Sequence, residues 1–341
     1  MKNTFVINGI ELESSTEVSN KITIKSHPYD YDVVFERFIN KFSDNEVVLV
    51  DEKVAKLYDI NHKKLVSIDA TEDNKTMDTV LFVCDKLLEY GFDKGNTLIV
   101  IGGGIIQDIG AYVGKTFKRG IKWVYVPTTL LSQCDSCIGG KTALNFRKYK
   151  NQLALFSAPS KVIIDTSFLK TLPKIEITSG YGEIVKLFLT GGDYYIQNLN
   201  NFDLDSAIFH SLSIKKAVIE YDEFENCERK SLNYGHSFGH AIESLTNYEI
   251  THGESVILGI EIINKLFIKS EEITSLTSKY VSLHRINHID VNKLIYALKT
   301  DKKVKDGIIS FVIVDKPGNT LFLETKIDNK LEDAVRALFI N

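Results

Sequence analysis

Residues 97–104 read Thr-Leu-Ile-Val-Ile-Gly-Gly-Gly, and this stretch decides the fold class expected for the chain. Residues 98–101 are an apolar run, and together with Thr97 they have the length typical of a buried strand. The three glycines follow, and Ile105 to Gly114 then reads as the start of a helix. Glycines in such a turn let the backbone approach a ligand, and a helix N-terminus favours a pyrophosphate. Gln107 stands where the dinucleotide fingerprint has its third glycine, so the stretch alone fits a tight turn as well as a cofactor site.

Segments on either side repeat this alternation of strand and helix. Residues 47–50 and 123–127 are two further strand-like runs, and Thr76 to Tyr90 has helical periodicity. Strands separated by helices of this length predict a parallel, doubly wound sheet with short connections.

The pattern changes after Pro173, where long helical stretches are broken by a lone strand-like run at residues 309–314. A chain of this length can form two domains, each with its own core. We expect residues 1–173 to form a Rossmann-like α/β nucleotide-binding domain and residues 174–341 to form a mainly α-helical metal-binding domain.

The composition is that of an ordinary globular protein. The 341 residues are 44% hydrophobic and 25% charged, and the formal net charge is −4. Nothing in this balance suggests a nucleic acid or an anionic membrane as a partner. The N-terminal residues lack the apolar run of a signal peptide, and no segment approaches the roughly 18 apolar residues of a membrane span. A cytoplasmic location is therefore expected.

Cys134 and Cys137 have the Cys-x-x-Cys spacing of a redox pair or of half a zinc site. No second pair of this spacing accompanies them. For a cytosolic chain we favour reduced, structural thiols.

Three of the eight histidines lie between residues 236 and 252. His236 and His240 are spaced i, i+4, so on a helix both rings project from one face, and His252 adds a third nitrogen. Such a set can bind a borderline-soft divalent metal, although a helix-face pair without a metal has the same spacing. The flanking glycines favour the metal site, because glycine is costly inside a helix and usually marks close backbone approach.

The segment from Pro127 to Asn145 is polar and glycine-rich, and Lys150-Asn151 follows it closely. It places hydroxyls, one carboxylate, paired glycines and Lys141 in a loop that hydropathy would not select for burial. A lone lysine is usually a solvated surface residue, but beside a double glycine Lys141 fits an anion cradle. Asp51, which ends the first strand, fits either a ribose contact or a helix N-cap.

Taken in order, these segments resemble the 3-dehydroquinate synthases, the founding family of the sugar-phosphate cyclases. The motifs keep the family's order over roughly residues 51 to 305, and the ordered set is far more specific than any one of them. They are Gly102–Gly104 with Asp108, Arg119-Gly120, Pro127–Leu131, Asp135–Thr142, Lys150-Asn151, Leu169–Pro173, Gly180–Lys186, Arg229–Glu243 and His252–Glu254.

The resemblance implies a catalytic zinc, with cobalt as an alternative, held by Glu183, His236 and His252, a set that leaves metal positions open. His240 would then be a catalytic neighbour rather than a ligand. The resemblance also implies NAD as a cofactor. Its contacts would be Asp51, Glu72, Lys75, Gly104, Ile105, Ile106, Gln107, Asp108, Thr128, Thr129, Lys141, Lys150, Phe168, Leu169, Lys170 and Thr171.

The substrate pocket implied in the same way is rich in cations, which suits a small polyanionic sugar phosphate. Its residues would be Asp135, Lys141, Lys150, Asn151, Lys186, Lys215, Arg229, Asn233, His240 and Lys302 or Lys303, with Arg119 reaching across the interface of a homodimer. Arg229 suits bidentate capture of a carboxylate, and lysines suit phosphate. Arg229 could instead pair with Glu225 or Glu228, which lie beside it in sequence.

The activity implied is that of a lyase of the shikimate pathway of aromatic amino-acid biosynthesis. It converts 3-deoxy-D-arabino-heptulosonate 7-phosphate to 3-dehydroquinate and phosphate. NAD⁺ takes up and returns one hydride, so the net reaction is redox-neutral.

The departures from the family pattern concern the cofactor side. They are Gln107, Ala154-Leu155, Lys53 and the segment from Ala70 to Lys75, which keeps only the glutamate and the lysine of the usual motif. Two other enzymes stay open: a related cyclase of secondary metabolism acting on sedoheptulose 7-phosphate or an amino-substituted analogue, and a metal-dependent polyol dehydrogenase. A degenerate binding protein is disfavoured, because none of the implied ligands is missing.

Overall fold

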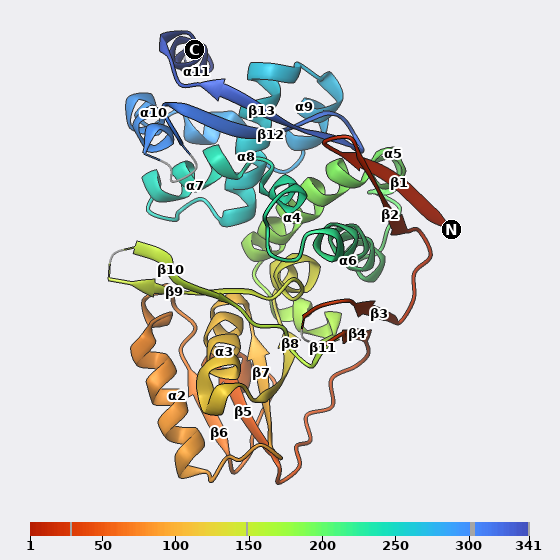
Figure 1. Ribbon diagram of the computed structural model, residues 1–341, viewed down its shortest axis with the longest axis vertical. Coiled ribbons are helices and arrows are strands. Elements are labelled where there is room, and N and C mark those ends of the chain that lie inside the picture. Colours follow the sequence, from red (N-terminus) through yellow and green to blue (C-terminus); the bar gives the residue numbers. More distant parts are fainter. Residues whose placement is uncertain (28, 148, 301–303, 340–341) are drawn as a thin grey trace. The chain divides into compact units, whose positions relative to one another are not determined.

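The computed structural model describes residues 1–27, 29–147, 149–300 and 304–339. The chain divides into two compact units (Figure 1). Unit 1 comprises Met1–Val18 and Pro173–Asn341, and unit 2 comprises Ser19–Leu172. The chain thus re-enters unit 1 at Pro173, where the sequence pattern changes.

Unit 2 is built on a seven-stranded sheet in the order β3-β4-β11-β8-β7-β5-β6. The strands are β3 (Lys21–Ile24), β4 (Tyr31–Phe35), β5 (Glu46–Asp51), β6 (Leu65–Ile68), β7 (Thr97–Gly102), β8 (Lys122–Pro127) and β11 (Lys161–Ile164). β3 runs antiparallel to β4, and the other neighbouring pairs are parallel. The three strands expected from the apolar runs are β5, β7 and β8.

The connections of unit 2 are helices, short helical turns and one hairpin. They are α1 (Glu52–Leu57), η1 (Glu72–Asn74), α2 (Met77–Glu89), α3 (Gly104–Thr116), η2 (Phe117–Arg119), η3 (Ser132–Ser136), η4 (Thr166–Thr171) and the antiparallel strands β9 (Lys141–Phe146) and β10 (Tyr149–Phe156). The helix expected at residues 76–90 is α2.

The two faces of this sheet have different covers because successive side chains of a strand point to opposite faces. Val100 of β7 faces α3, where Gly110 brings the helix so close that a Cβ on it would lie 2.6 Å from the Val100 side chain. Ile99 and Ile101 point the other way, into a core that includes Phe168 of η4.

The strand order creates a topological switch between β5 and β7. With β5 as the first strand, the parallel strands β6, β5, β7, β8 and β11 have the doubly wound order 2-1-3-4-5, rather than the 3-2-1-4-5-6 order of the dinucleotide-binding Rossmann domains. Ligands of such open sheets bind outside the carboxyl ends of the strands at the switch point. Those two ends carry Asp51 on β5 and the glycines that begin at Gly102 on β7.

Unit 1 combines a four-stranded sheet, in the order β12-β13-β1-β2, with a set of helices. The strands are β1 (Lys2–Ile7), β2 (Ile10–Ser15), β12 (Ile308–Lys316) and β13 (Asn319–Lys326). The helices and helical turns are α4 (Lys174–Gly191), α5 (Asp193–Asn198), α6 (Leu204–Tyr221), η5 (Glu228–Asn233), α7 (His236–Leu245), α8 (His252–Ile263), η6 (Asn264–Ile268), α9 (Glu271–Thr277), η7 (Leu283–Ile286), α10 (Val291–Lys299) and α11 (Asn329–Ala337). Among the described residues, no helix has both the length and the apolar character needed to cross a membrane.

The structure differs from the expectation for this unit in two respects. The strand-like run at 309–314 is not alone, because it forms β12 and pairs with β13 in a hairpin. The first eighteen residues do not join the nucleotide-binding sheet. β1 instead pairs in parallel with β13, and Phe5 and Ile7 are buried in unit 1.

Glycines bring helices of unit 1 together backbone to backbone. A Cβ on Gly182 of α4 would lie 2.3 Å from the carbonyl oxygen of Gly253 on α8. A Cβ on Gly259 of α8 would lie 2.0 Å from the carbonyl oxygen of Gly235, the residue before α7. Because α8 approaches both α4 and the start of α7 so closely, the polar residues at these crossings are fixed relative to one another.

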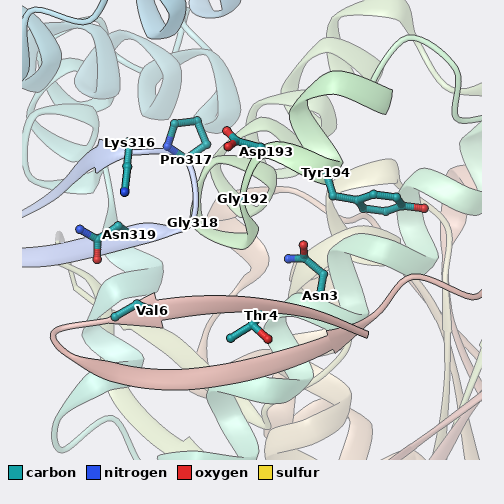
Figure 2. Close-up of a pocket in the computed structure, with 10 residues that line it drawn as sticks. All are labelled: Asn3, Thr4, Val6, Gly192, Asp193, Tyr194, Lys316, Pro317, Gly318 and Asn319. Atoms are coloured by element: carbon teal, nitrogen blue, oxygen red, sulfur yellow. The ribbon is translucent and has the colours of Figure 1, made fainter. Parts of the chain in front are cut away.

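A shallow hollow of about 370 Å³ lies on unit 1, where the turn between β12 and β13 meets the start of α5 (Figure 2). Gly192 and Gly318 both line the hollow; their backbones approach each other, and both have positive φ. Its rim includes Asp193 and Lys316, both exposed.

Candidate functional site

Three helices of unit 1 supply the candidate metal ligands. Glu183 comes from α4, His236 is the first residue of α7, and His252 is the first residue of α8. Helix α7 can begin at His236 because Gly235 takes a left-handed conformation, with φ of 78°. Helix α8 begins with a capping box, in which the side chains of Thr251 and Glu254 satisfy the first backbone N–H groups.

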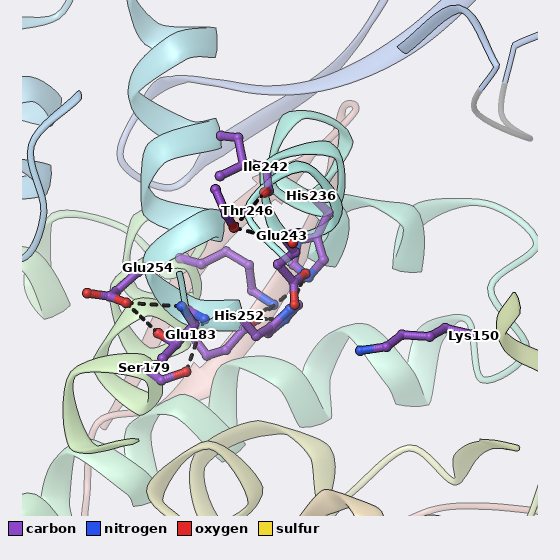
Figure 3. Close-up of polar contacts among 12 residues, drawn as sticks. Lys150, Ser179, Glu183, His236, Ile242, Glu243, Thr246, His252 and Glu254 are labelled. Atoms are coloured by element: carbon purple, nitrogen blue, oxygen red, sulfur yellow. Dashed lines mark hydrogen bonds and ion pairs between the residues drawn. The ribbon is translucent and has the colours of Figure 1, made fainter. Parts of the chain in front are cut away.

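The two histidines direct their Nε2 atoms at the same carboxylate oxygen (Figure 3). The Nε2 atom of His252 lies 3.0 Å from Oε1 of Glu183, and the Nε2 atom of His236 lies 3.6 Å from it. One ligand atom from each residue lies within 4.8 Å of the others, so one ion can contact all three. Glu183 and His236 are buried, at 1% and 9% exposure.

The opposite ring nitrogens already have partners. Nδ1 of His236 donates to the backbone carbonyl of Tyr234 at 3.1 Å, and Nδ1 of His252 lies 3.0 Å from Oε2 of Glu243. Each neutral ring is thereby left with a lone pair on Nε2, the atom that faces Glu183. A carboxylate and two imidazole nitrogens in this arrangement fit a zinc-type divalent ion with open coordination positions.

Electrostatics at the site favour an anionic Glu183. Burial by itself would raise the pKa of this carboxyl, but the Lys186 ammonium, with which it forms an ion pair, and the His252 hydrogen bond hold the pKa below its usual value. Burial and the nearby charge of Lys186 lower the pKa of His236 well below its ordinary value. Burial opposes charge on His252 too, but its hydrogen bonds to Glu183 and Glu243 raise its pKa to about 10.

His240 lies beside the two histidines but outside their set with Glu183. Its ring centroid is 5.2 Å from that of His236 and 6.0 Å from that of His252, and the residue is exposed. The role of His240 as a catalytic neighbour stays a prediction. His240, Glu243 and His252 nevertheless form a second group whose ligand atoms lie within 4.8 Å of one another.

The cations expected in the substrate pocket of unit 1 are buried. Lys186 on α4, Lys215 on α6 and Arg229 on η5 are 2%, 7% and 1% exposed, and the three elements contact one another. Three buried cations on elements in contact concentrate positive charge in one part of unit 1, which makes this cluster a candidate anion site.

Arg229 and Asn233 have local partners within the loop before α7. The Arg229 guanidinium donates to the backbone carbonyl of Glu223, and its backbone N–H donates to Asp222 at 3.0 Å. Asn233 donates to Oε1 of Glu225 at 2.8 Å.

In unit 2, the triple-glycine turn is closely packed on one side and open on the other. A Cβ on Gly102 would lie 2.7 Å from the Ile106 side chain, and a Cβ on Gly103 would lie 2.9 Å from Thr129. A Cβ on Gly104 would meet nothing within 4 Å. The first helical residue of α3 thus faces open space, as a phosphate-binding turn requires. Asp51, at the neighbouring strand end, accepts from Lys53 N and caps α1, so the N-cap alternative is realised.

A polar cluster next to this turn centres on Lys75, which is 7% exposed. Its Nζ atom lies 2.7 Å from Asn151, 3.2 Å from Asp108 and 3.6 Å from Glu72. Lys150 lies 3.5 Å from the same Glu72 oxygen. The structure therefore brings together four expected cofactor residues, Glu72, Lys75, Asp108 and Lys150. Lys150 was also expected in the substrate pocket, as was Asn151, and both lie on β10.

The carboxylates of this cluster differ in pKa. Burial raises the pKa of Asp108 despite the Lys75 ammonium. Burial acts on Glu72 in the same direction, but the Asn145 hydrogen bond and the charges of Lys75 and Lys150 hold its pKa below the usual value.

The polar segment from Pro127 to Asn145 is more buried than its hydropathy predicts, and this part of the expectation was wrong. Gln133 is fully buried, and its Nε2 group donates to the carbonyls of Pro127 and Asp165, both at 2.9 Å. Cys134 and Cys137 are also buried, neither is in a disulfide, and their thiols point at backbone carbonyls. Hydrogen bonds to the backbone replace the water that these polar groups would lose.

Other expected residues of this segment flank the turn. Asp135 lies in η3, Lys141 is exposed at the start of β9, and Thr142 donates to Oδ1 of Asp108 at 3.0 Å. Gln107 of α3 is buried and forms a two-way hydrogen bond with Ser136, at 2.6 and 2.7 Å. The residue that departs from the family glycine therefore connects α3 to η3.

The remaining expected residues are placed as follows. Thr128 donates its N–H to Gly102, and Ile105 and Ile106 lie in the first turn of α3. Phe168 and Leu169 are buried in η4, Lys170 is exposed, and Thr171 bonds to Tyr58 at 2.7 Å. Arg119 ends η2 with a positive φ of 65°. Lys302 and Lys303 lie outside the described residues.

Three residues of these clusters were not among the expected site residues: Glu243, Glu225 and Asn145. Each acts through a hydrogen bond to an expected residue, namely His252, Asn233 and Glu72. The spacing of Glu243, three residues after His240, was a usable signal, because i, i+3 residues share a helix face.

Comparisons with known proteins match this architecture. The family profiles described as 3-dehydroquinate synthase N-terminal and 3-dehydroquinate synthase C-terminal match residues 65–179 and 180–304. A 3-dehydroquinate synthase from Pelagibacter ubique (strain HTCC1062) is 40% identical over 278 residues, which are 74% of this chain and 76% of that protein.

Two solved structures share the fold, each with a TM-score of 0.78. One is 2-epi-5-epi-valiolone synthase from Streptomyces hygroscopicus subsp. jinggangensis 5008 with NAD⁺ and Zn²⁺ bound, 23% identical, covering 95% of this chain and 99% of that one. The other is 2-deoxy-scyllo-inosose synthase complexed with carbaglucose-6-phosphate, NAD⁺ and Co²⁺, 20% identical, covering 93% of this chain and 99% of that one. With both family profiles matched in order and a curated relative at 40% identity, the chain belongs to the 3-dehydroquinate synthase family.

Proposed function

We propose that the protein is a 3-dehydroquinate synthase, a lyase that converts 3-deoxy-D-arabino-heptulosonate 7-phosphate to 3-dehydroquinate and phosphate with NAD and a divalent metal, zinc or cobalt. The observation that carries the proposal is the convergence of Glu183, His236 and His252 beside the Lys186 ammonium. A metal site next to buried cations suits a substrate with both hydroxyl and anionic groups.

Unit 1 would hold the metal through Glu183, His236 and His252. The fit rests on the two Nε2 atoms that face one carboxylate oxygen while both Nδ1 atoms have other partners. In the absence of an ion, two imidazole lone pairs and a carboxylate repel one another unless a proton intervenes. The raised pKa of His252 indicates that its ring carries that proton.

Unit 2 would hold NAD at the carboxyl end of the sheet, in a Rossmann-like manner. The support is the switch point between β5 and β7, the open side of Gly104, and the N-terminus of α3. The solved cyclases of the same fold carry NAD⁺ and a divalent ion. Glu72, Lys75 and Asp108 would contribute the polar contacts expected of them.

The metal and NAD would supply part of the chemistry, and side chains of the protein would supply the rest. When bound, the metal would lower the pKa of a substrate hydroxyl, and NAD⁺ would accept a hydride from the same carbon and later return it. Arg229, Lys215 and Lys186 would orient the substrate's anionic groups, because buried cations attract an anion more strongly than exposed ones. The leaving phosphate can take up the substrate proton itself, which reduces the need for a protein base.

Two alternative enzymes would carry out related chemistry. A cyclase for sedoheptulose 7-phosphate has no substrate carboxylate and no need for Arg229, Lys215 and Asn233 together, and the two solved cyclases are less similar to this chain than the curated synthase is. A polyol dehydrogenase would release NADH with every turnover.

The test is phosphate release from 3-deoxy-D-arabino-heptulosonate 7-phosphate by the purified protein with NAD⁺, with and without a chelator. We expect release that stops with the chelator, returns with added zinc, and occurs without accumulation of NADH. Growth of NADH absorbance in proportion to product would favour the dehydrogenase. Faster turnover of sedoheptulose 7-phosphate than of the carboxylated substrate would favour the other cyclase.

A further inference from the structure

Glu243 lies on α7, one turn after His240, and its side chain is 15% exposed. Its Oε2 atom is 3.0 Å from Nδ1 of His252, while Nε2 of the same ring is 3.0 Å from Glu183 (Figure 3). The His252 ring is thus held between one carboxylate from α7 and another from α4.

We infer that Glu243 is a positioning residue for the metal: it accepts the Nδ1–H of His252 and holds the ring with Nε2 directed at Glu183. This inference rests on the metal site of the proposed function. It assigns a task to a residue that itself need not touch the ion, the substrate or the cofactor.

The backbone of His252 is already fixed, which leaves the ring as the part that needs an anchor. His252 opens α8 inside a capping box, and Gly253 packs its backbone against Ser179 of α4. Rotation about the side-chain bonds is the freedom that remains, together with the choice of tautomer. A hydrogen bond at Nδ1 removes both, because it places the proton on Nδ1 and the lone pair on Nε2.

The rings of His236 and His252 are held in orientation by different partners. His236 donates Nδ1 to the carbonyl of Tyr234, two residues before it, so its anchor is built into the local backbone. His252 receives its anchor from the side chain of Glu243 on another helix. A carboxylate also increases the basicity of the ring more than a neutral carbonyl does. Loss of Glu243 should therefore affect metal affinity through His252 alone.

A competing role for Glu243 is direct ligation. Its carboxylate, His240 and His252 form the second group whose ligand atoms lie within 4.8 Å. An ion bound there would use Nδ1 of His252, and Glu183 would lose its place as a ligand. Direct ligation and positioning predict different metal spectra and different effects of substitution.

The experiment compares zinc dissociation constants, measured by chelator competition, for the wild type, Glu243→Gln, Glu243→Ala and Glu183→Ala. Glu249→Gln is the matched control, because Glu249 is exposed in the segment between α7 and α8 and makes the same change of charge. We expect Glu243→Ala to weaken zinc binding about 10- to 100-fold. Glu243→Gln should weaken it less, because its amide oxygen still accepts the Nδ1–H. Glu249→Gln should match the wild type.

Two further measurements separate positioning from other roles. The metal-free Glu243→Gln variant should stay folded at the assay temperature, although its melting temperature should fall somewhat, because the variant loses the charge of Glu243 beside His252. The visible spectrum of the Co²⁺-loaded Glu243→Ala variant should keep its wild-type band positions, because the ligands are unchanged.

Wild-type zinc affinity in Glu243→Ala would overturn the inference. So would zinc loss as complete as that of Glu183→Ala together with altered cobalt bands, since that result assigns Glu243 as a ligand. A wild type that binds zinc tightly but releases no phosphate would overturn the proposed function and leave this inference standing.

Discussion

His252 has a carboxylate partner on each side of its ring, Glu183 at Nε2 and Glu243 at Nδ1, so two helices besides its own determine the orientation of this one side chain. The histidines themselves were predictable, because their spacing places nitrogens on one helix face. Glu183 entered only through the family resemblance, since it precedes His236 by more than fifty residues in the chain. The partnership of Glu243 with His252 was not predictable, because it depends on how α7 and α8 cross.

Arg229 gives the same lesson. The contact of its guanidinium with the backbone carbonyl of Glu223 depends on how the loop folds, and so does the role of Asp222. The Asp222 carboxylate organises the loop, because it accepts from the backbone N–H groups of Asn226, Cys227 and Arg229. Local sequence identifies the charges, but the fold of the loop decides which of them meet.

The protonation of the metal-free site gives a prediction at this scale. Despite burial, Glu183 and Glu243 raise the pKa of His252 to about 10, whereas His236 is neutral because burial and Lys186 lower its pKa. Zinc binds only neutral imidazole, so at pH 8 uptake of zinc should release about one proton from His252. The released fraction should fall towards zero as the pH rises past 10, where His252 is already neutral.

Calorimetric titration of zinc into the metal-free protein, in two buffers with different ionisation enthalpies, counts these protons. Zinc uptake at pH 8 with no dependence on the buffer would contradict the charged state assigned to His252.

At the scale of the element, three of the seven strands in the sheet of unit 2, β5, β7 and β8, and the helices α2 and α3 could be predicted to within one or two residues. The apolar run at 47–50 became β5 (Glu46–Asp51), and that at 97–101 became β7 (Thr97–Gly102). Buried parallel strands leave such runs in the sequence because both of their faces are covered. The hairpin of β9 and β10 left no such run, since most of its residues are exposed or only partly buried.

Glycines at element ends give a second prediction, because two of them sit in opposite surroundings. A Cβ on Gly104 meets open space, whereas a Cβ on Gly253 would lie 1.8 Å from the carbonyl oxygen of Ser179. Gly104→Ala should therefore leave stability unchanged or slightly higher, since alanine favours a helix by about 1 kcal/mol over glycine. Its methyl group should nevertheless weaken NAD⁺ binding, because it occupies the open side of the turn.

Gly253→Ala should behave in the reverse way. It must push α8 away from α4 and displace His252, at a cost of about 1–3 kcal/mol or more, and it should lower the zinc content. NAD⁺ affinity should stay at its wild-type value. Urea unfolding, zinc analysis and an NAD⁺ titration of both variants separate these effects. Full zinc occupancy and an unchanged urea midpoint in Gly253→Ala would refute the close packing of α4 and α8.

At the scale of the whole molecule, the chain begins and ends in unit 1 and forms unit 2 in between. The boundary near Pro173 was visible as a change from alternating strands to long helices. The place of the first eighteen residues was not, because β1 pairs with β13, which follows it by more than three hundred residues. Local patterns carry no information about such a pairing.

This division gives the last prediction, which uses one buried residue from each unit. Ile7 on β1 and Val50 on β5 are both fully buried, but Ile7 lies in unit 1 and Val50 in the core of unit 2. Ile7→Ala should cost about 2–5 kcal/mol through the lost apolar contacts and the cavity left behind. If β1 stabilises the metal-binding unit, hydrogen exchange in Ile7→Ala should accelerate in β13, α4 and α8, and zinc should be released at a lower temperature. Exchange in β5, β7 and β8 should stay at the wild-type rate.

Val50→Ala should show the opposite pattern, with faster exchange in the strands of unit 2 and normal zinc retention. If Ile7→Ala accelerated exchange in β5 and β7 as much as in α8, the first strand would belong energetically to the nucleotide-binding sheet, as the sequence alone had suggested.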